Sequence, residues 1–277
     1  SIHIHSNARW KQNGTTVSGG NGLDSGLNQL NNPLGLDVND DQTIYVADLT
    51  NHRIIEWKLG ATSGKVRDSL ITSDSENERL VRWPRYNGTS GETIISNIHG
   101  TGLAMDNNGS LYGVDEKHYA VRRYQIGDTE GAVVGGGNGK RNRLDQLSSP
   151  QLVFVDRHHP VYVSDLRNHR VMKWEEGAKQ GIVVASGQGQ GNSLTQLSVS
   201  LGVFVDQLGT VYVADRGNDR IMRWPTEATQ ESVIIGENGT GAQSNQFSNP
   251  IDLAFDRHGS LYVTDLNNNR VQRFSIL

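Results

Sequence analysis

An internal repeat of 50 residues constrains the fold of this chain more than any other feature. Three segments align without gaps: Val161–Asp165, Val211–Asp215 and Leu261–Asp265. Each has a Tyr at its second position and ends in Asp, and each is followed by an Asn, an Arg and a run that closes with an aromatic residue. A fixed period of this length indicates a repeat protein, in which each repeat packs on its neighbours.

Each repeat reads as four short strands. In the repeat that begins at Leu201, the segments 202–206, 210–214, 220–224 and 232–235 are separated by turn-forming residues, and the same order recurs from positions 33, 100, 150 and 250. Four antiparallel strands joined by short loops form the blade of a β-propeller. The second strands lie around Tyr45, Ile71, Tyr112, Tyr162, Tyr212 and Tyr262. The sequence therefore predicts an all-β, six-bladed propeller that forms one domain over residues 1–277.

The first and last repeats depart from the regular pattern together. The last repeat stops after its third strand, and residues 15–20 match the fourth strand of a complete repeat, 182–187. We therefore expect an N-terminal strand to complete the last blade, which closes the ring and removes its open sheet edges.

The second repeat is short. Trp57 and Trp83 are 26 residues apart, although 50 separate the equivalent residues of other repeats. Segments 69–74 and 77–83 match a second and a third strand, and the fourth strand of the preceding blade is reduced to about residues 64–66. We expect a truncated blade 2; either it lacks its first strand, or the sequence is incomplete here.

A motif follows the second strand in the regular repeats: Asp, two residues, Asn, one residue, Arg. It is present as Asn51-His52-Arg53, Asn168-His169-Arg170, Asn218-Asp219-Arg220 and Asn268-Asn269-Arg270. This motif resembles the NHL repeat, and the resemblance covers nearly the whole chain. It implies an NHL-type propeller and says little about activity, because such folds host many functions. Residues 116–120 replace the motif in blade 3, so other contacts must hold that loop.

Most of the repeated polar and aromatic residues are expected to be structural. One Asp per blade ends the second strand, where it can accept backbone N–H groups and pair with the Arg five residues later in its own or the next blade. The aspartates at 106, 156, 206 and 256 fit turns. The residues expected to end third strands and pack between blades are Trp10, Trp57, Trp83, Tyr124, Trp174, Trp224 and Phe274. The Gly-rich segments are expected to cross from blade to blade.

Composition excludes several classes of function. The 277 residues include no cysteine, so disulfides, thiolate metal sites and cysteine nucleophiles are absent. A net charge of −4 argues against a nucleic-acid partner. A mean hydropathy of −0.54, with no long apolar run, predicts a soluble chain without a membrane helix. No signal-peptide pattern is visible; the sequons permit secretion without showing it, and secretion is slightly favoured. The compartment and the oligomeric state stay open.

Functional residues are expected where the blades differ, on the face formed by the loops leading into first strands and the loops joining second to third strands. The candidates near the first strands are Leu34, Thr101, Gln151, Leu201, Ile251 and Asp252. The candidates in the second-to-third-strand loops are Thr50, Glu116, Lys117, Arg167, Arg216 and Asn267. This mixed apolar and charged surface suits a protein or small ligand.

Three hypotheses for function follow. The first is a non-enzymatic scaffold that binds a protein, peptide or glycan, with no catalytic residue, metal or other cofactor. The second is a metal-dependent hydrolase or lyase. It rests on resemblance to propeller enzymes such as gluconolactonases, paraoxonases and amidating lyases, which implies calcium or zinc in the central channel, with Asp252 as the one non-repeating carboxylate near a first strand. The third is RNA binding, known among NHL-type propellers, which the acidic balance speaks against.

Overall fold

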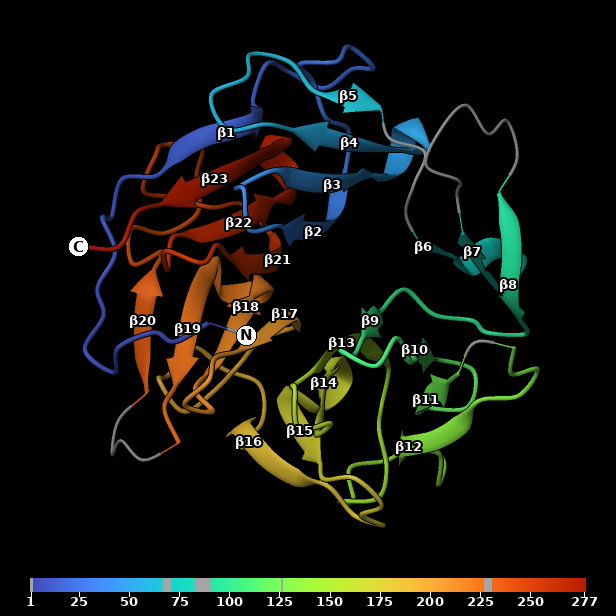
Figure 1. Cartoon of the computed structure of the whole chain (residues 1–277). Helices are drawn as coiled ribbons and strands as arrows, with labels where there is room; N and C mark the ends of the chain where they lie inside the picture. Colours follow the sequence, from blue (N-terminus) through green and yellow to red (C-terminus); the bar gives the residue numbers. More distant parts are fainter. Residues whose placement is uncertain (1, 67–70, 83–90, 126, 227–230) are drawn as a thin grey trace. The chain divides into compact units, whose positions relative to one another are not determined.

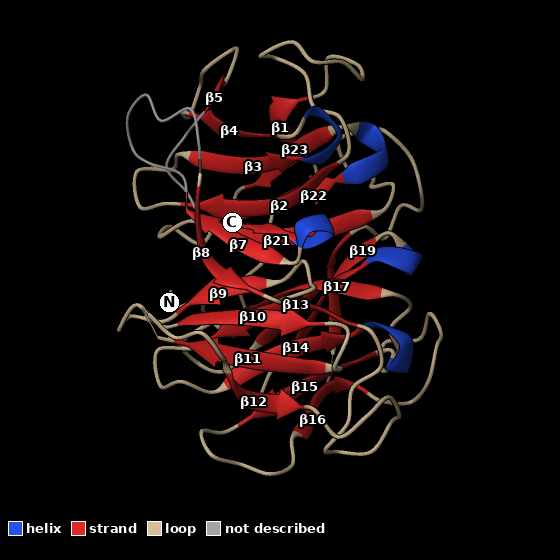
Figure 2. Ribbon diagram, turned by 90° about the vertical axis from the view of Figure 1, so that its right-hand side faces the viewer, coloured by secondary structure: helices blue, strands red, loops and turns tan. Residues whose placement is uncertain are grey.

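The computed structural model describes residues 2–66, 71–82, 91–125, 127–226 and 231–277. Its strands form six antiparallel sheets, and the helices of the described part are five short 3-10 turns (Figures 1 and 2). None of these turns has the length and hydropathy needed to cross a membrane. The chain divides into two compact units, Ser1–Arg67 with Phe204–Leu277, and Asp68–Val203. That the whole chain acts as one domain stays a prediction.

The first unit holds two complete four-stranded sheets and most of a third. One sheet contains β2 (Pro33–Val38), β3 (Ile44–Asp48), β4 (Arg53–Trp57) and β5 (Lys65–Val66). Another contains β21 (Pro250–Phe255), β22 (Leu261–Asp265), β23 (Arg270–Phe274) and β1 (Thr15–Gly19). The third contains β17 (Ser200–Val205), β18 (Val211–Asp215), β19 (Arg220–Trp224) and β20 (Ser232–Ile235). The boundary between the units falls within β17.

The N-terminal strand completes the last blade, as predicted. β1 pairs antiparallel with β23, from Thr15 opposite Arg273 to Gly19 opposite Arg270, and Figure 1 shows the blue strand beside the red one. The last sheet therefore gains its fourth strand from the opposite end of the sequence, and β23 is not left as a sheet edge.

The second unit holds one three-stranded and two four-stranded sheets. The short sheet contains β6 (Ile71–Asp74), β7 (Arg79–Arg82) and β8 (Glu92–Ser96). The next contains β9 (Leu103–Met105), β10 (Leu111–Asp115), β11 (Ala120–Tyr124) and β12 (Ala132–Gly136). The last contains β13 (Pro150–Val155), β14 (Val161–Asp165), β15 (Arg170–Trp174) and β16 (Ile182–Ser186). The predicted truncation of blade 2 is confirmed. Trp83 and residues 69–70 of the predicted strands lie outside the described residues.

A left-handed residue connects the second and third strands of the regular blades. The 3-10 turns are η1 (Leu49–Asn51), η2 (Ser75–Asn77), η3 (Leu166–Asn168), η4 (Arg216–Asn218) and η5 (Leu266–Asn268). The residue after each turn has φ between 49° and 52°; these residues are His52, Glu78, His169, Asp219 and Asn269. Asn, Asp and His adopt this conformation more readily than other non-glycine residues, which explains the middle position of the Asn-x-Arg motif.

Aromatic residues that end the third strands fill the core between neighbouring blades. Trp57 is 2% exposed and belongs to one apolar cluster with Val46 of its own blade and Tyr262 of the last blade. Trp174 packs in the same way with residues of blades 3 and 4. Trp10 departs from the prediction, because it lies outside the strands. Its indole Nε1 donates to Gly259 O at 2.8 Å.

Candidate binding rim

A buried aspartate organises the loop between the second and third strands. Asp265 Oδ2 accepts hydrogen bonds from Asn268 Nδ2 and Arg270 Nε, both at 2.8 Å. Its Oδ1 accepts the backbone N–H of Ser248 at 2.7 Å. The same ion pair recurs as Asp48–Arg53, Asp74–Arg79, Asp165–Arg170 and Asp215–Arg220. The repeated aspartates are therefore structural, as predicted, and each partner arginine lies in the same blade.

The motif arginine also fixes the crossover from the preceding blade. The guanidinium of Arg270 donates to the carbonyl oxygens of Ala242, Gln243 and Gln246 at 2.8–3.0 Å. These residues belong to the Gly-rich segment between β20 and β21, which confirms that such segments are blade-to-blade crossovers. The guanidinium of Arg270 thereby uses its planar set of donors to join the loop after β22 to this crossover.

Blade 3 reaches the same result with different residues. His118 Nδ1 lies 2.8 Å from Asp115 Oδ2, and Arg122 Nε donates to the same oxygen at 2.7 Å. The motif would place its arginine at Ala120, and Arg122 lies two residues further along β11. Side chains two apart in a strand point to the same face, so the shifted arginine still reaches the carboxylate.

The tips of these loops are held by their backbone and present their side chains outward. Thr50 N donates to Asn31 O at 3.2 Å, and the N–H groups of Arg167 and Asn267 make the equivalent bonds at 3.0 and 3.1 Å. Four predicted tip residues are exposed: Thr50, Lys117, Arg167 and Asn267. Arg216 is half-buried, and its Nε lies 3.4 Å from Asn249 Oδ1. The tips thus place chemically different side chains on a fixed backbone. Within each unit, we call these tips, together with the starts of the first strands, the rim.

The remaining candidates lie differently from the prediction. Leu34, Gln151, Leu201, Ile251 and Asp252 belong to the first strands themselves and do not precede them. The strand register shifts there, between Pro33 and Leu36 in β2 and at the equivalent places in β13 and β21. Leu201 and Ile251 are only 7% and 5% exposed, whereas Leu34 and Gln151 are half-buried.

In the first unit, Asp252 links the last blade to blade 1. Its Oδ2 accepts the backbone N–H of Leu36 at 3.0 Å, and its Oδ1 accepts that of Leu253 at 2.9 Å. Burial raises the pKa of Asp252 to about 7; the two N–H groups oppose this, and the negative charge of Asp37 adds to it. Desolvation by the surrounding protein also raises the pKa of Asp37, although its side chain is exposed to solvent.

The sequence argument missed Asp37. It occupies the strand position that Phe154, Phe204 and Ala254 hold in other blades, so an alignment of the repeats could have found it.

In the second unit, three predicted residues come together around a half-buried carboxylate. Burial raises the pKa of Glu116, while His99 and a hydrogen bond with the side chain of Gln151 lower it. The Glu116 N–H donates to His99 O at 2.7 Å, and Thr101 Oγ1 lies 3.4 Å from Gln151 O. Thr101, Glu116 and Gln151 thus form a polar cluster contributed by blades 3 and 4. His99 is a further member that the sequence argument missed.

A metal site is not evident from side-chain grouping. Among the residues that the structure describes, no three His, Asp or Glu side chains are arranged to hold one ion. The absence of a cofactor, and the alternative of a calcium ion, both stay predictions.

Six antiparallel sheets, five with four strands and one with three, define a six-bladed β-propeller. Two segments of the chain, residues 30–56 and 247–274, match the family model of the NHL repeat. The chain is therefore a six-bladed propeller that carries NHL repeats at these two positions, which is consistent with an NHL-repeat propeller. No curated protein matches its sequence.

Solved structures share the fold at low sequence identity. An auxiliary nutrient binding protein from Bacteroides thetaiotaomicron is 13% identical, with a TM-score of 0.70 over 97% of this chain and 77% of that one. A PQQ-bound aldose sugar dehydrogenase from Streptomyces coelicolor is 14% identical, with a TM-score of 0.64 over 99% of this chain and 100% of that one. Virginiamycin B lyase from Staphylococcus aureus is 12% identical, with a TM-score of 0.55 over 92% and 98%. At such identities the similarity concerns the fold alone.

Proposed function

We propose that this propeller is a binding scaffold, which recognises a protein, peptide or glycan ligand on the rim. The observation that carries the proposal is the construction of the loop tips. The Asp-Asn-Arg network fixes the tip backbone, and the side chains at the tips are exposed and differ from blade to blade. Loops that are already ordered lose little conformational entropy on binding, and varied side chains on them provide specificity.

The rim candidates divide into three roles in this proposal. Thr50, Lys117, Arg167 and Asn267 are exposed and make the outer contacts. Glu116, Gln151 and Thr101 provide hydrogen-bonding groups in the second unit, as Asp252 and Arg216 do in the first. Leu34 adds an apolar contact, while the buried Leu201 and Ile251 support the strand starts from below.

Solved structures with the same fold support a binding function but do not identify the ligand. Two Bacteroides proteins of this fold are described as auxiliary nutrient binding proteins. A lyase and a dehydrogenase have it as well, so the fold accommodates both binding and catalysis.

The test is a screen of the purified chain on a glycan array and a random-peptide display library. The best glycan or peptide is then titrated against Arg167→Ala and Arg157→Ala. Arg167 is at a loop tip of blade 4, whereas Arg157 is an exposed residue in the turn at the other end of the same blade. We expect Arg167→Ala to weaken binding about tenfold and Arg157→Ala to leave it unchanged. Equal effects of the two variants, or no binder in either screen, would contradict the proposal.

The proximity of Asp37 and Asp252 favours a second candidate function, a hydrolase or lyase. Two carboxyl groups with raised pKa values on neighbouring first strands have the properties of an acid-base pair. Calcium is the metal we propose for this alternative, because it prefers carboxylate oxygens. Elemental analysis of the purified protein, with Asp252→Asn for comparison, tests it: bound calcium that the variant loses would support an enzyme.

A further inference from the structure

Strand β6 forms one edge of the three-stranded sheet in the second unit. It pairs with β7 in unbroken register, from Ile71 opposite Arg82 to Asp74 opposite Arg79. The strand order β6-β7-β8 makes β6 an edge strand of this sheet, which is drawn in teal in Figure 1. In the other five sheets the equivalent strand lies between two neighbours. In the part of the chain that the structure describes, no first strand lies beside β6, unlike the equivalent strands of the other blades.

Burial shows the effect of the missing strand. The equivalent strands β10, β14, β18 and β22 are buried at all five of their residues, and β3 is buried at three of five. All four residues of β6 are only half-buried. β6 is thus the least buried of these strands, in agreement with the missing neighbour.

β6 also lacks several of the features that protect a sheet edge. The outer strands β1, β8, β12, β16 and β20 each pair with a register shift, which disrupts the ladder and bends the strand. β6 has no register shift, no proline and no lysine among its residues. A regular, unprotected edge is a template for strand addition.

The neighbouring chain is too short to supply the missing strand. β5 ends at Val66 and β6 begins at Ile71, so four residues separate them. In blade 1 the first strand and its turn require residues 33–43. The four residues between β5 and β6 are therefore seven fewer than the eleven that the first strand and turn occupy in blade 1. A first strand of the usual length needs residues from elsewhere.

We propose that β6 binds an extended segment of another polypeptide, which adds to the sheet as the first strand of blade 2. The binding is β-augmentation: backbone hydrogen bonds provide affinity, and alternate side chains provide specificity. It uses a strand edge and goes beyond ligand recognition on the rim.

The first strands of the other blades indicate which side chains the added segment should carry. In blade 4, Val153, Phe154 and Val155 lie opposite Val163, Tyr162 and Val161. Ile71 takes the place of Tyr162, and it packs against the apolar cluster that contains Leu80 and Tyr124. A large apolar side chain at the position of Phe154 would therefore cover Ile71. The segment resembles the first strands of this chain, with apolar residues at its fourth to sixth positions.

The strand pairing of blade 4 indicates the direction of the added segment, and charge indicates the residue that precedes it. The first strand of blade 4 begins at Pro150, opposite Asp165, so the added segment would begin beside Asp74. The adjoining turn η2 carries Glu76, which is exposed. A lysine or arginine just before the segment would lie near this carboxylate, and we expect the partner to have one there.

The experiment uses a peptide of residues 150–155 with one added N-terminal lysine and a fluorescent label. We expect saturable binding to the full chain by fluorescence anisotropy, and slower amide exchange at residues 71–74. A peptide N-methylated at alternate amides is the matched control, because it keeps the side chains and loses the ladder. Failure to bind, or equal binding of the N-methylated peptide, would overturn the proposal.

Variants of the chain locate the contact. Ser73→Lys places a charge on the β6 edge, and Ser96→Lys places it on β8, the opposite edge of the same sheet. We expect the first to weaken peptide binding about tenfold and the second to leave it within about twofold. Because the Ser73 hydroxyl donates to Gly100 O, the thermal unfolding of both variants confirms that each is folded. Equal effects of the two variants would contradict binding at the β6 edge. Protection of the β6 amides that rises with the concentration of the chain, without peptide, would mean that a second copy of this chain binds there and would contradict a separate partner.

Discussion

His159 Nδ1 lies 3.3 Å from Asp106 Oδ2, and this contact connects the first-strand turns of blades 3 and 4. Asp106 also accepts the Tyr112 hydroxyl at 3.1 Å. Burial raises the pKa of Asp106, but hydrogen bonds from Ser110, Tyr112 and Asn108 and the charge of His159 outweigh it and lower the pKa. Gln42 makes the corresponding contact in the first unit, from its Nε2 to Asp256 Oδ2 at 2.5 Å.

The contact predicts an effect of His159 on stability. His159 has a φ of 71°, where the turns of blades 5 and 6 have Gly209 and Gly259. His159→Gly relieves the backbone and loses the contact between blades, whereas His159→Gln keeps a side chain of the Gln42 type. We expect the glycine variant to lose about 1 kcal/mol of unfolding free energy relative to the glutamine variant in urea denaturation. A glycine variant at least as stable would contradict a contact that outweighs the relief of the backbone.

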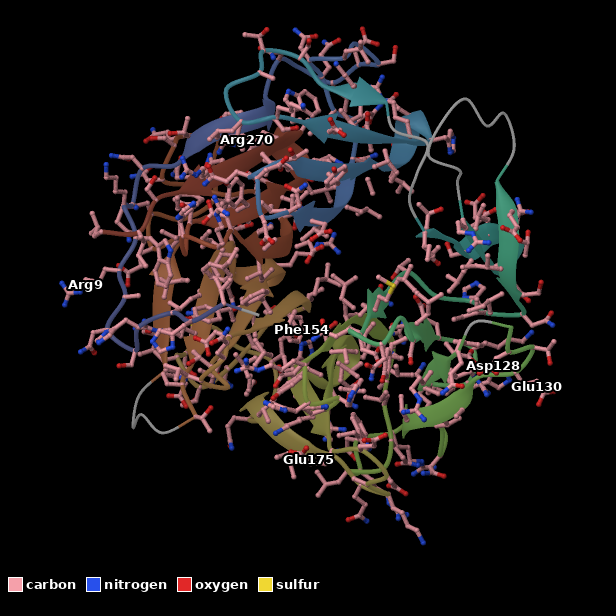
Figure 3. All side chains as sticks on the ribbon, in the orientation of Figure 1. Arg9, Asp128, Glu130, Phe154, Glu175 and Arg270 are labelled. Atoms are coloured by element: carbon pink, nitrogen blue, oxygen red, sulfur yellow. The ribbon has the colours of Figure 1, made fainter. Side chains whose placement is uncertain are left out.

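The motif arginine predicts a larger loss. Arg270→Ala leaves the buried carboxylate of Asp265 without its cation and frees three carbonyl oxygens. We expect a loss of about 3–5 kcal/mol, measured by chemical denaturation. Arg9, which points away from the ribbon in Figure 3, is the control, and Arg9→Ala should change stability by less than about 0.5 kcal/mol. Similar losses for both would contradict the role of the network.

The shifted arginine of blade 3 predicts a rescue. Arg122→Ala should destabilise the chain by about 2–4 kcal/mol, because Asp115 keeps only His118 as a side-chain partner. Adding Ala120→Arg restores an arginine at the motif position of the other blades and should recover part of that stability. Thermal unfolding of the single and double variants measures this. A double variant less stable than Arg122→Ala would show that the loop of blade 3 cannot accept the motif.

Asp252 predicts how stability varies with pH. Its pKa of about 7 in the folded chain exceeds the unfolded value of about 4. Its contribution to stability is therefore complete below pH 4 and is lost as the pH rises through 7, by at most about 1.4 kcal/mol per pH unit. Asp252→Asn should flatten this dependence in urea denaturation at pH 4.5, 6 and 7.5.

Asp37→Asn provides the control for this pH effect. Removal of its charge lowers the pKa of Asp252 in the folded chain, so the loss of stability should end at a lower pH and be smaller in total. Identical pH profiles for the wild-type chain and Asp252→Asn would show that Asp252 does not titrate in this range.

Features that recur in every blade could be predicted from the sequence. The Asp265–Arg270 pair repeats one pattern, and the structure shows the ion pair as expected. Two departures from that pattern are also found as expected: the strand that begins at Thr15 and the shortened stretch after Trp57. A repeat averages out local ambiguity, because the same packing must be satisfied several times.

Contacts between different blades could not be predicted in the same way. The neighbour of Asp252 is Leu36, over two hundred positions away, and no spacing within one repeat indicates it. The register shift at the start of β21 could not be predicted either, although a shift of one residue changes which side chains face the core.

The pairing of β1 with β23 has a consequence for biosynthesis. Residues 15–19 leave the ribosome early but find their partner only when residues 270–274 have been made. During translation β1 is an unprotected strand, available to wrong partners such as the same segment of a neighbouring nascent chain. The last blade can therefore form only after translation has reached its third strand, and the slow, long-range closure of this sheet is expected to limit the rate at which the chain matures.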